Sequence, residues 1–310
     1  MNKIATVFGG SGFIGRQIVS RLVQAGYSVR VPTRVLAHAE PLRQLGTPGV
    51  VTPILLDVHD VGQVGDAVAN ADVVVNCIGV LTDSRHQPFN IIQGEVPGII
   101  ARAANAAGVK HLVHISAIGA DANSPSAYAR SKAAGEGVVR AIFPQAVILR
   151  PSIVFGPEDG FFNRFAKMAM VSPVLPLLGG GRTRMQPVYV ADVAAAALQA
   201  IVRTDARGKV FELGGPAIYT FRQLMQTLLF FIRRRRFLVP VPWGLALLMG
   251  RILEKLPGKM LTRDQVVLLQ RDNVVNSNGH TLEDIGVAPT ALEAVLPTYL
   301  DVYLPKGRFQ

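Results

Sequence analysis

The chain of 310 residues is long enough for one large domain or two modest ones, and its content of 49% hydrophobic and 17% charged residues excludes intrinsic disorder. A single cysteine, Cys77, excludes an internal disulfide framework and is typical of a reducing compartment. The net charge of +11 indicates an anionic partner, which could be nucleic acid, a membrane surface or a phosphorylated ligand.

The chain begins with an apolar run, Ile4–Phe8, that follows Lys3 and leads directly into glycines. A secretory leader would have a longer apolar stretch here, and a mitochondrial leader would be rich in Arg and Ser. We therefore expect no signal or transit peptide. The expected location of this bacterial-like protein is the cytoplasmic side, with peripheral attachment to the inner membrane left open.

Over the first 150 residues, short β-branched runs alternate with helical stretches. Near-continuous apolar strands separated by helices predict a parallel sheet that is covered on both faces. Six such strands are typical of a doubly wound α/β fold of the Rossmann type. The predicted strands are Ile4–Phe8, Ser28–Val31, Val51–Leu56, Val73–Cys77, His111–Ile115 and Ala146–Leu149. The predicted helices are Phe13–Ala25, Val61–Ala69, Ile91–Ala107 and Ala127–Ile142.

A glycine-rich loop follows the first predicted strand, with Gly9, Gly12 and Gly15 in the spacing G-x-x-G-x-x-G. Glycines permit a tight turn, a close approach of the backbone to a pyrophosphate and close packing of helix on strand. The helix that opens with Phe13 and Ile14 would direct its free N–H groups at the phosphates. Because the loop joins a strand to a helix, it predicts a dinucleotide site, and a plain glycine turn is the alternative.

The residues that follow the next strands bear on the choice of cofactor. A site for NAD usually has Asp or Glu about 20 residues beyond the glycines, but here Arg34 follows the second strand and the next acid is Glu40. A forked guanidinium suits the 2′-phosphate of NADP, so NADP(H) is favoured over NAD(H); a solvated loop arginine is the alternative. Asp57 is placed to accept a hydrogen bond from the adenine amine, and Asn76 and Gly79 are placed beside the cofactor.

A possible catalytic set lies at the fifth strand and the helix after it. Tyr128 and Lys132 are four residues apart and therefore share one face of a helix. A neighbouring ammonium favours the phenolate, so the pKa of Tyr128 is expected to be lowered. Ser116 closes the fifth strand, at the edge where open α/β sheets bind ligands. An ordinary surface helix is the alternative interpretation.

Beyond Pro151 the alternation ends in Pro- and Gly-rich turns with scattered helices. We therefore predict a dinucleotide-binding domain over residues 1–155. A smaller, mostly helical C-terminal lobe is predicted over residues 156–310.

The positive charge is concentrated in one part of this lobe. Residues 221–263 carry nine basic side chains and one acidic side chain, and four of the basic ones are Arg233, Arg234, Arg235 and Arg236. The flanking apolar runs are too short to span a membrane. An Arg-rich block beside Phe, Leu and Trp suits helices in a membrane interface or against a membrane-bound partner. A buried helix pair with a solvated arginine turn is equally compatible, and nucleic acid is not expected.

These motifs together resemble the extended short-chain dehydrogenase/reductase superfamily. The resemblance includes Gly9-x-x-Gly12-x-x-Gly15, Asp57, Ser116, Tyr128-x-x-x-Lys132 and the stretch Leu149–Pro157. It implies that Tyr128 is the acid–base catalyst, that Lys132 also holds the nicotinamide ribose, and that Ser116 steadies the substrate. By the same resemblance, Pro151 belongs to a loop beside the nicotinamide.

Three C-terminal stretches are similar to the NAD(P)H-binding accessory subunit of respiratory complex I and its bacterial relatives. They are Gln186–Val193, Leu261–Val266 and Leu282–Val287. The resemblance implies a nucleotide-holding protein, chiefly for NADPH, that is structural or assembly-related and lies against the membrane part of the complex near the quinone site. Related atypical reductases are linked to ubiquinone biosynthesis.

Three functions therefore remain open. The first is an NADP(H)-binding protein that supports respiratory-chain or ubiquinone function at the membrane surface. The second is an active NADPH-dependent reductase or epimerase that uses Ser116, Tyr128 and Lys132 on a sugar-nucleotide, isoprenoid or quinone-like substrate. The third is a redox-sensing regulator. The six histidines show no metal-ligand spacing with acidic residues, so no metal site is expected.

Overall fold

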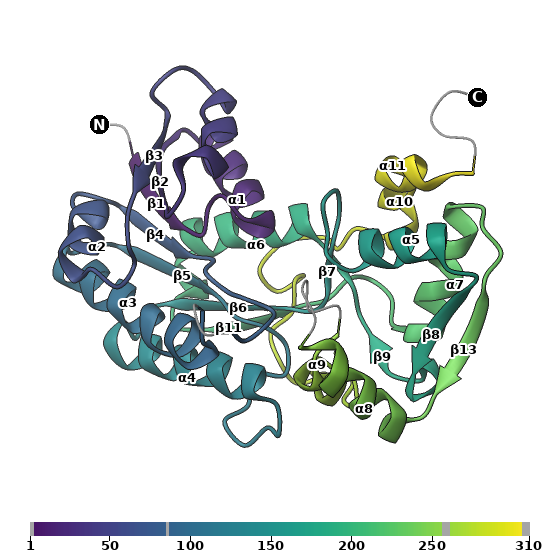
Figure 1. The fold of residues 1–310 in the computed structure, drawn as a ribbon. Coiled ribbons are helices and arrows are strands. Elements are labelled where there is room, and N and C mark those ends of the chain that lie inside the picture. Colours follow the sequence, from purple (N-terminus) through teal and green to yellow (C-terminus); the bar gives the residue numbers. More distant parts are fainter. Residues whose placement is uncertain (1–2, 85–86, 256–260, 306–310) are drawn as a thin grey trace. The chain divides into compact units, whose positions relative to one another are not determined.

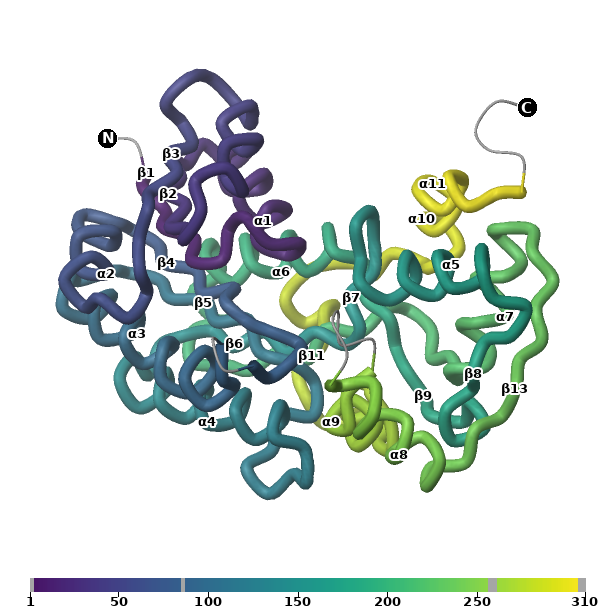
Figure 2. The backbone as a smooth tube through the Cα atoms, in the orientation of Figure 1, coloured from purple at the N-terminus to yellow at the C-terminus, as the bar shows by residue number. Residues whose placement is uncertain are grey.

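The computed structural model describes residues 3–84, 87–255 and 261–305. The chain forms two compact units, and it crosses between them several times. The first, here called the Rossmann unit, comprises Met1–Pro151, Val190–Leu213 and Asn278–Ala288. The second unit comprises Ser152–Tyr189, Gly214–Ser277 and Pro289–Gln310. Figure 2 traces the backbone through these segments.

The Rossmann unit is built on a seven-stranded sheet whose neighbouring strands all run parallel (Figure 1). The strand order is β11-β6-β5-β4-β1-β2-β3, so the order reverses between β1 and β4. Open α/β sheets bind ligands at such a reversal, beyond the carboxyl ends of the strands. The strands are β1 (Lys3–Phe8), β2 (Tyr27–Thr33), β3 (Val51–Leu55), β4 (Val73–Asn76), β5 (His111–Ile115), β6 (Val147–Pro151) and β11 (Val210–Leu213).

Helices cover both faces of this sheet, which confirms the predicted doubly wound α/β class. Helix α1 packs against α6 on one face, and α2, α3 and α4 pack together on the other (Figure 1). Their bounds are α1 (Phe13–Gln24), α2 (Val61–Val68), α3 (Val96–Ala106), α4 (Ala127–Ile142) and α6 (Val190–Val202). Short 3-10 turns lie at η1 (Leu36–His38), η2 (Glu40–Gln44) and η5 (Thr204–Ala206).

The helix predicted over Ile91–Ala107 is divided into a π-helical turn, η3 (Asn90–Glu95), and α3. Pro97 has no N–H group to donate to the carbonyl of Gln93, four residues earlier, so a regular α-helical ladder is interrupted there. Gly135 of α4 lies against that carbonyl, because a Cβ built on Gly135 would be 2.1 Å from the Gln93 oxygen. The irregular turn thus allows η3 and α4 to approach closely.

The second unit combines helices with small two-stranded sheets around an aromatic core, and helices account for most of its regular structure, as the sequence predicted. Its two-stranded sheets are β7–β10, β9–β12 and β8–β13. The core contains the rings of Phe155, Phe162 and Phe221. The strands are β7 (Val154–Phe155), β8 (Val174–Leu178), β9 (Arg184–Met185), β10 (Val188–Tyr189), β12 (Tyr219–Thr220) and β13 (Phe237–Val241). The helices are α5 (Phe162–Val171), η4 (Gly179–Gly181), α7 (Phe221–Phe231), α8 (Trp243–Leu253), α9 (Arg263–Leu268), α10 (Leu292–Val295), α11 (Pro297–Leu300) and η6 (Asp301–Tyr303).

The sequence placed a single domain boundary at residues 155/156. In the structure the chain first leaves the Rossmann unit after Pro151, and it returns at Val190 and again at Asn278. The first return supplies α6 and the edge strand β11, and the second supplies a segment that meets β11 at Phe211 and His280. A contiguous division of the chain therefore leaves out parts of both units.

The contact between Gly135 and the Gln93 carbonyl predicts opposite effects for two substitutions in one helix. Gly135→Ala should lower the free energy of unfolding by about 1–3 kcal/mol, because the new methyl group has no room. Gly137→Ala is the control, since nothing lies within 4 Å of its Cβ position; it should stabilise the protein by about 0.5–1 kcal/mol. Urea unfolding measures both, and equal effects would contradict the packing described.

Candidate functional site

The glycine loop between β1 and α1 divides into residues that pack and residues that remain accessible. A Cβ on Gly15 would lie 2.1 Å from the Gly9 carbonyl oxygen, and Gly9 itself has φ +74°. Both positions therefore require glycine. Gly12, which is exposed, precedes the helix without a side-chain cap, so Phe13 and Ile14 open a first turn whose N–H groups face no capping side chain. This cradle fits a phosphate group.

Arg16, which the sequence analysis did not single out, lies beside this loop. Its Nη2 donates a hydrogen bond to the Ser11 carbonyl at 2.9 Å. The side chain thus places a positive charge against the backbone that would hold a pyrophosphate. Its place immediately after Gly15, the third glycine of the loop, is the sequence signal that could have identified Arg16.

Arg34 and Asp57 lie at the same edge of the sheet, because β2 and β3 are parallel neighbours and both residues come just after them. Both side chains are exposed. With the Gln87 amide oriented to present its oxygen, Nη1 and Nη2 of Arg34 lie 2.5 and 2.6 Å from that oxygen. The Asp57 carboxylate accepts a hydrogen bond from the His59 N–H at 3.0 Å. Both residues therefore lie at the edge of the sheet where a cofactor's adenosine would lie, and a 2′-phosphate there would take the place of the Gln87 amide on Arg34.

Asn76 ends β4 and shapes the loop that follows it. Its Oδ1 accepts a hydrogen bond from the Ile78 N–H at 3.0 Å, and its Nδ2 lies 3.2 Å from Nδ1 of His114. Burial lowers the pKa of His114 to about 3, so this ring is neutral near pH 7. The loop brings Gly79 against α4, where a Cβ on Gly79 would lie 3.2 Å from the Lys132 amine.

The three predicted catalytic residues are placed around the end of β5. Lys132 is buried; its Nζ donates to the Ile115 carbonyl at 3.2 Å and lies 6.0 Å from the centre of the Tyr128 ring. Tyr128 is half-buried and meets Phe89 edge to face at 5.7 Å. Ser116, next to Ile115, is buried, and its hydroxyl has no hydrogen-bond partner among the described residues. Such a buried hydroxyl is suited to a ligand that supplies the missing partner.

The electrostatics of this set differ from the expectation. Burial raises the pKa of Tyr128 to about 12, where the proximity of Lys132 was expected to lower it. Burial also lowers the pKa of Lys132 to about 8, although the nearby Glu136 carboxylate acts in the opposite direction. Loss of hydration disfavours both charged forms, and at this separation the ammonium does not offset that cost for the phenol.

An ion-pair network holds α4 to the sheet. Glu136, one turn beyond Lys132, binds Arg150 of β6 in a bidentate manner at 2.7 and 2.9 Å. Arg150 also contacts Glu212 of β11 at 3.5 Å. Glu136 is buried, so the two-point geometry matters for compensating its desolvation. The network fixes α4 relative to β6 and β11.

Gln93 in the π-helical turn is a second residue that the sequence analysis missed. Its buried amide accepts a hydrogen bond from the Ser131 hydroxyl at 3.2 Å and donates to the Val80 carbonyl at 2.5 Å. It therefore ties the loop after β4 to α4. Pro97, four residues later, was the sequence signal that the helix is irregular at Gln93.

Pro151 lies at the carboxyl end of β6, and its carbonyl accepts a hydrogen bond from the Ile118 N–H at 3.0 Å. It is thus adjacent to the segment that follows Ser116. The remainder of the predicted nicotinamide loop, residues 152–157, belongs to the second unit.

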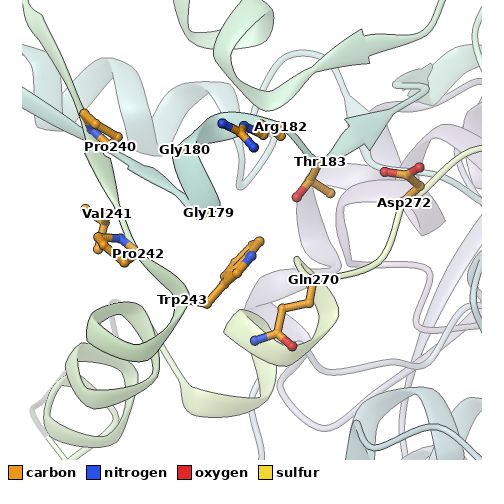
Figure 3. Close-up of a pocket in the computed structure, with 10 residues that line it drawn as sticks. All are labelled: Gly179, Gly180, Arg182, Thr183, Pro240, Val241, Pro242, Trp243, Gln270 and Asp272. Carbon is orange, nitrogen blue, oxygen red and sulfur yellow. The ribbon is translucent and has the colours of Figure 1, made fainter.

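The second unit contains a separate hollow of about 600 Å³ (Figure 3). The Trp243 ring packs on Gly179, where a Cβ would lie 2.0 Å from the indole. Asp272, which also lines the hollow, is paired with Arg184 at 2.7 Å. The hollow contains no acid–base pair like that of Tyr128 and Lys132, so the Rossmann unit holds the better candidate for chemistry.

Residues 3–84, 87–255 and 261–305 lack two other kinds of site. No helix there is long and apolar enough to cross a membrane. Within the same residues, no cluster of three His, Cys, Asp or Glu side chains is arranged to hold a metal ion.

Comparison with known proteins adds three findings. The pattern of the NAD dependent epimerase/dehydratase family matches residues 5–214. A mitochondrial protein of Mus musculus, NADH dehydrogenase [ubiquinone] 1 alpha subcomplex subunit 9, is 36% identical over 292 residues, which are 94% of this chain and 78% of that protein. Ceramide reductase of Caulobacter vibrioides is 32% identical over 207 residues, 67% of this chain and 63% of that protein.

The fold is also found among solved structures. The NADPH-dependent quinone oxidoreductase QOR2 of Escherichia coli, complexed with NADPH, superposes with a TM-score of 0.74 at 21% identity. The match covers 94% of this chain and 97% of that one. At this level of identity the likeness concerns the fold.

The lowered pKa of Lys132 predicts a specific pH dependence of stability. Between pH 8 and the ordinary lysine value, the unfolded chain binds a proton that the folded chain does not. The free energy of unfolding of wild type should therefore rise with pH in this window, relative to Lys132→Met, by up to about 1.4 kcal/mol per pH unit. Urea unfolding at several pH values measures the difference, and parallel curves for the two proteins would contradict it.

Proposed function

The chain belongs to the NAD dependent epimerase/dehydratase family, and on this premise we propose that it binds NADP(H) at a membrane surface in support of a respiratory complex or of ubiquinone function. The observation that carries the cofactor assignment is Arg34, which occupies the position after β2 where an acidic residue would select NAD. Its exposed guanidinium can pair with a 2′-phosphate in a forked geometry.

The remaining cofactor contacts follow from the cradle described above. Gly9, Gly12 and Gly15, with the first turn at Phe13 and Ile14, would hold the pyrophosphate. Asp57 would accept from the adenine amine, while Asn76, Gly79 and Pro151 would line the nicotinamide end with Tyr128 and Lys132. When bound, the nicotinamide nucleotide supplies or accepts a hydride.

The similarity to the mouse subunit supports the respiratory part of the proposal. The family pattern ends at residue 214, whereas the similarity to the mouse subunit extends over 94% of the chain. It therefore includes most of the second unit, where the basic segment 221–263 lies; residues 256–260 of that segment are outside the described residues.

Helix α8 supports the membrane part of the proposal. It buries only Ala246 and Gly250, whereas Leu245, Leu248 and Ile252 are each more than half exposed. Spacings of three and four residues place these three side chains along one side of the helix. By contrast, α7 buries most of its apolar residues in the core of the unit, as the alternative of a buried helix anticipated.

The cofactor assignment predicts discrimination between the two nucleotides. Arg34→Gln should weaken NADPH binding at least tenfold, since a hydrogen-bonded charge pair contributes about 1.5–3 kcal/mol, and should leave NADH binding within about twofold. Titration calorimetry with both nucleotides provides the measurement, and mass spectrometry of nucleotide released from the purified wild type provides a check. Equal losses for NADPH and NADH would contradict the assignment.

The membrane assignment predicts that wild type floats with vesicles of phosphatidylcholine and phosphatidylglycerol. Binding should weaken as the salt concentration rises, because the attraction of basic side chains to anionic lipid is screened. Vesicles of phosphatidylcholine alone are the control. Failure of wild type to float with anionic vesicles at low salt would refute the membrane role.

A second function, reduction of a carbonyl, is favoured by the unsatisfied hydroxyl of Ser116. Ser116 would donate a hydrogen bond to the substrate oxygen. The carbonyl carbon would receive the hydride of the nucleotide while Tyr128 gives its phenolic proton to the oxygen, with Lys132 stabilising the resulting phenolate. The likeness to a ceramide reductase supports a lipid-like carbonyl substrate, alongside the sugar-nucleotide, isoprenoid and quinone-like classes.

Turnover distinguishes the two functions. NADPH oxidation with a panel of ceramide-like, isoprenoid and quinone-like carbonyls should fall by about two to four orders of magnitude in Tyr128→Phe, as expected for the loss of a general acid. NADPH affinity should be retained in this variant. Absence of turnover in wild type with every class would leave the holding function alone.

A further inference from the structure

The four consecutive arginines after α7 do not share one environment. From residue 233 to residue 239, exposed and half-buried side chains alternate strictly. The exposed side chains, here called the outer row, are Arg233, Arg235, Phe237 and Val239. The half-buried side chains, here called the inner row, are Arg234, Arg236 and Leu238.

The side chains of the inner row make contacts within the second unit. Nε of Arg234 donates to the Tyr303 carbonyl at 3.0 Å, and Nε of Arg236 donates to the Ala169 carbonyl at 2.7 Å. Ala169 lies in the last turn of α5, where unpaired carbonyls and the helix dipole favour a cation. Leu238 packs against the core of the unit. These two arginines are therefore structural.

The two guanidinium groups of the outer row have no hydrogen-bond or ion-pair partner in the described part of the chain. Neither the Arg233 nor the Arg235 guanidinium takes part in an ion pair or side-chain hydrogen bond among residues 3–84, 87–255 and 261–305. Arg233 also has φ +51° at the end of α7, where its N–H bonds to Phe230 and the next N–H bonds to Leu229. This pairing is a Schellman motif, whose left-handed residue is usually glycine.

Apolar side chains continue the outer row along β13. Phe237 is 76% exposed and Val239 is 41% exposed. The parallel register with β8 pairs Phe237 with Val174, so these two side chains lie side by side on one face of the small sheet. Val174 is also exposed. An uncovered aromatic ring with aliphatic neighbours next to two free cations is an amphipathic surface.

We propose that the outer row binds an anionic phospholipid surface, with Arg233 and Arg235 on the lipid phosphates and Phe237 and Val239 at the acyl boundary. The inference rests on the proposed membrane function and assigns it to particular residues. Charge complementarity favours this occupant, since the row has two cations without acids and then purely apolar side chains. A nucleic acid would require more cations with interleaved stacking surfaces.

Paired variants separate the two rows. In flotation with vesicles of phosphatidylcholine and phosphatidylglycerol, R233Q/R235Q should bind roughly 25-fold more weakly, since each arginine near an anionic surface contributes about fivefold. Its thermal midpoint should equal that of wild type. R234Q/R236Q removes the same charge but should retain vesicle binding, and its midpoint should fall by a few degrees because two bonds to carbonyls are lost.

A third variant tests the apolar part of the surface. F237S/V239S should lower vesicle binding roughly tenfold, in line with the loss of one buried aromatic side chain, while a charge-only mechanism leaves it unchanged. The single tryptophan, Trp243, lies just after β13 and provides an independent signal. Its fluorescence should be quenched by brominated lipid in wild type and in R234Q/R236Q, but not in R233Q/R235Q.

The outcomes distinguish this inference from the proposal on which it rests. Equal loss of vesicle binding in the two arginine pairs, or wild-type binding by R233Q/R235Q, would overturn the outer row while leaving the membrane function in place. Failure of wild type to bind any vesicle would overturn both. Retained NADPH affinity in all variants, measured alongside, confirms that the Rossmann unit is intact.

Discussion

The arrangement of the candidate site depends on keeping one buried amine in place. Lys132 has lost most of its hydration, and a group of this kind is tolerated only where carbonyl and carboxylate oxygens replace the water. The Ile115 carbonyl does so directly, and Glu136 does so one helical turn away. Glu136 is itself bound by Arg150 of β6, and Arg150 also contacts Glu212 of β11. The position of the Lys132 amine therefore depends on both strands. Helix α4 and strands β6 and β11 are therefore joined by one continuous set of charged contacts.

Much of the Rossmann unit could be predicted because its signals are local. Six strands with continuous apolar runs, and a glycine loop between a strand and a helix, are recognisable within a few residues. Strand β11 was not, since it joins β6 only after the chain has passed through the segment Ser152–Tyr189 of the second unit. The π-helical turn was missed as well. Gln93 and Pro97 are far from Gly135 in the chain, and their shared role in the close packing of η3 on α4 is visible only in the folded structure.

The chemistry of the candidate site could also be predicted only in part from the sequence. Sequence spacing correctly placed Tyr128 and Lys132 on one helix face, but the direction of the Tyr128 pKa depends on how much solvent the surrounding elements exclude. Likewise, a run of four arginines looks uniform until the strand that follows it is placed. The carbonyls of Ala169 and Tyr303, both distant in sequence, then separate structural arginines from available ones.

The repeated crossing of the chain between its units has a consequence for biosynthesis. As the protein emerges from the ribosome, the first 151 residues can form six parallel strands, but β6 remains an uncovered edge until β11 is made. Unpaired strand edges promote association with other chains. The first segment of the second unit must be synthesised before this edge is closed. During that interval the nascent chain therefore presents one open strand edge that the finished protein does not have.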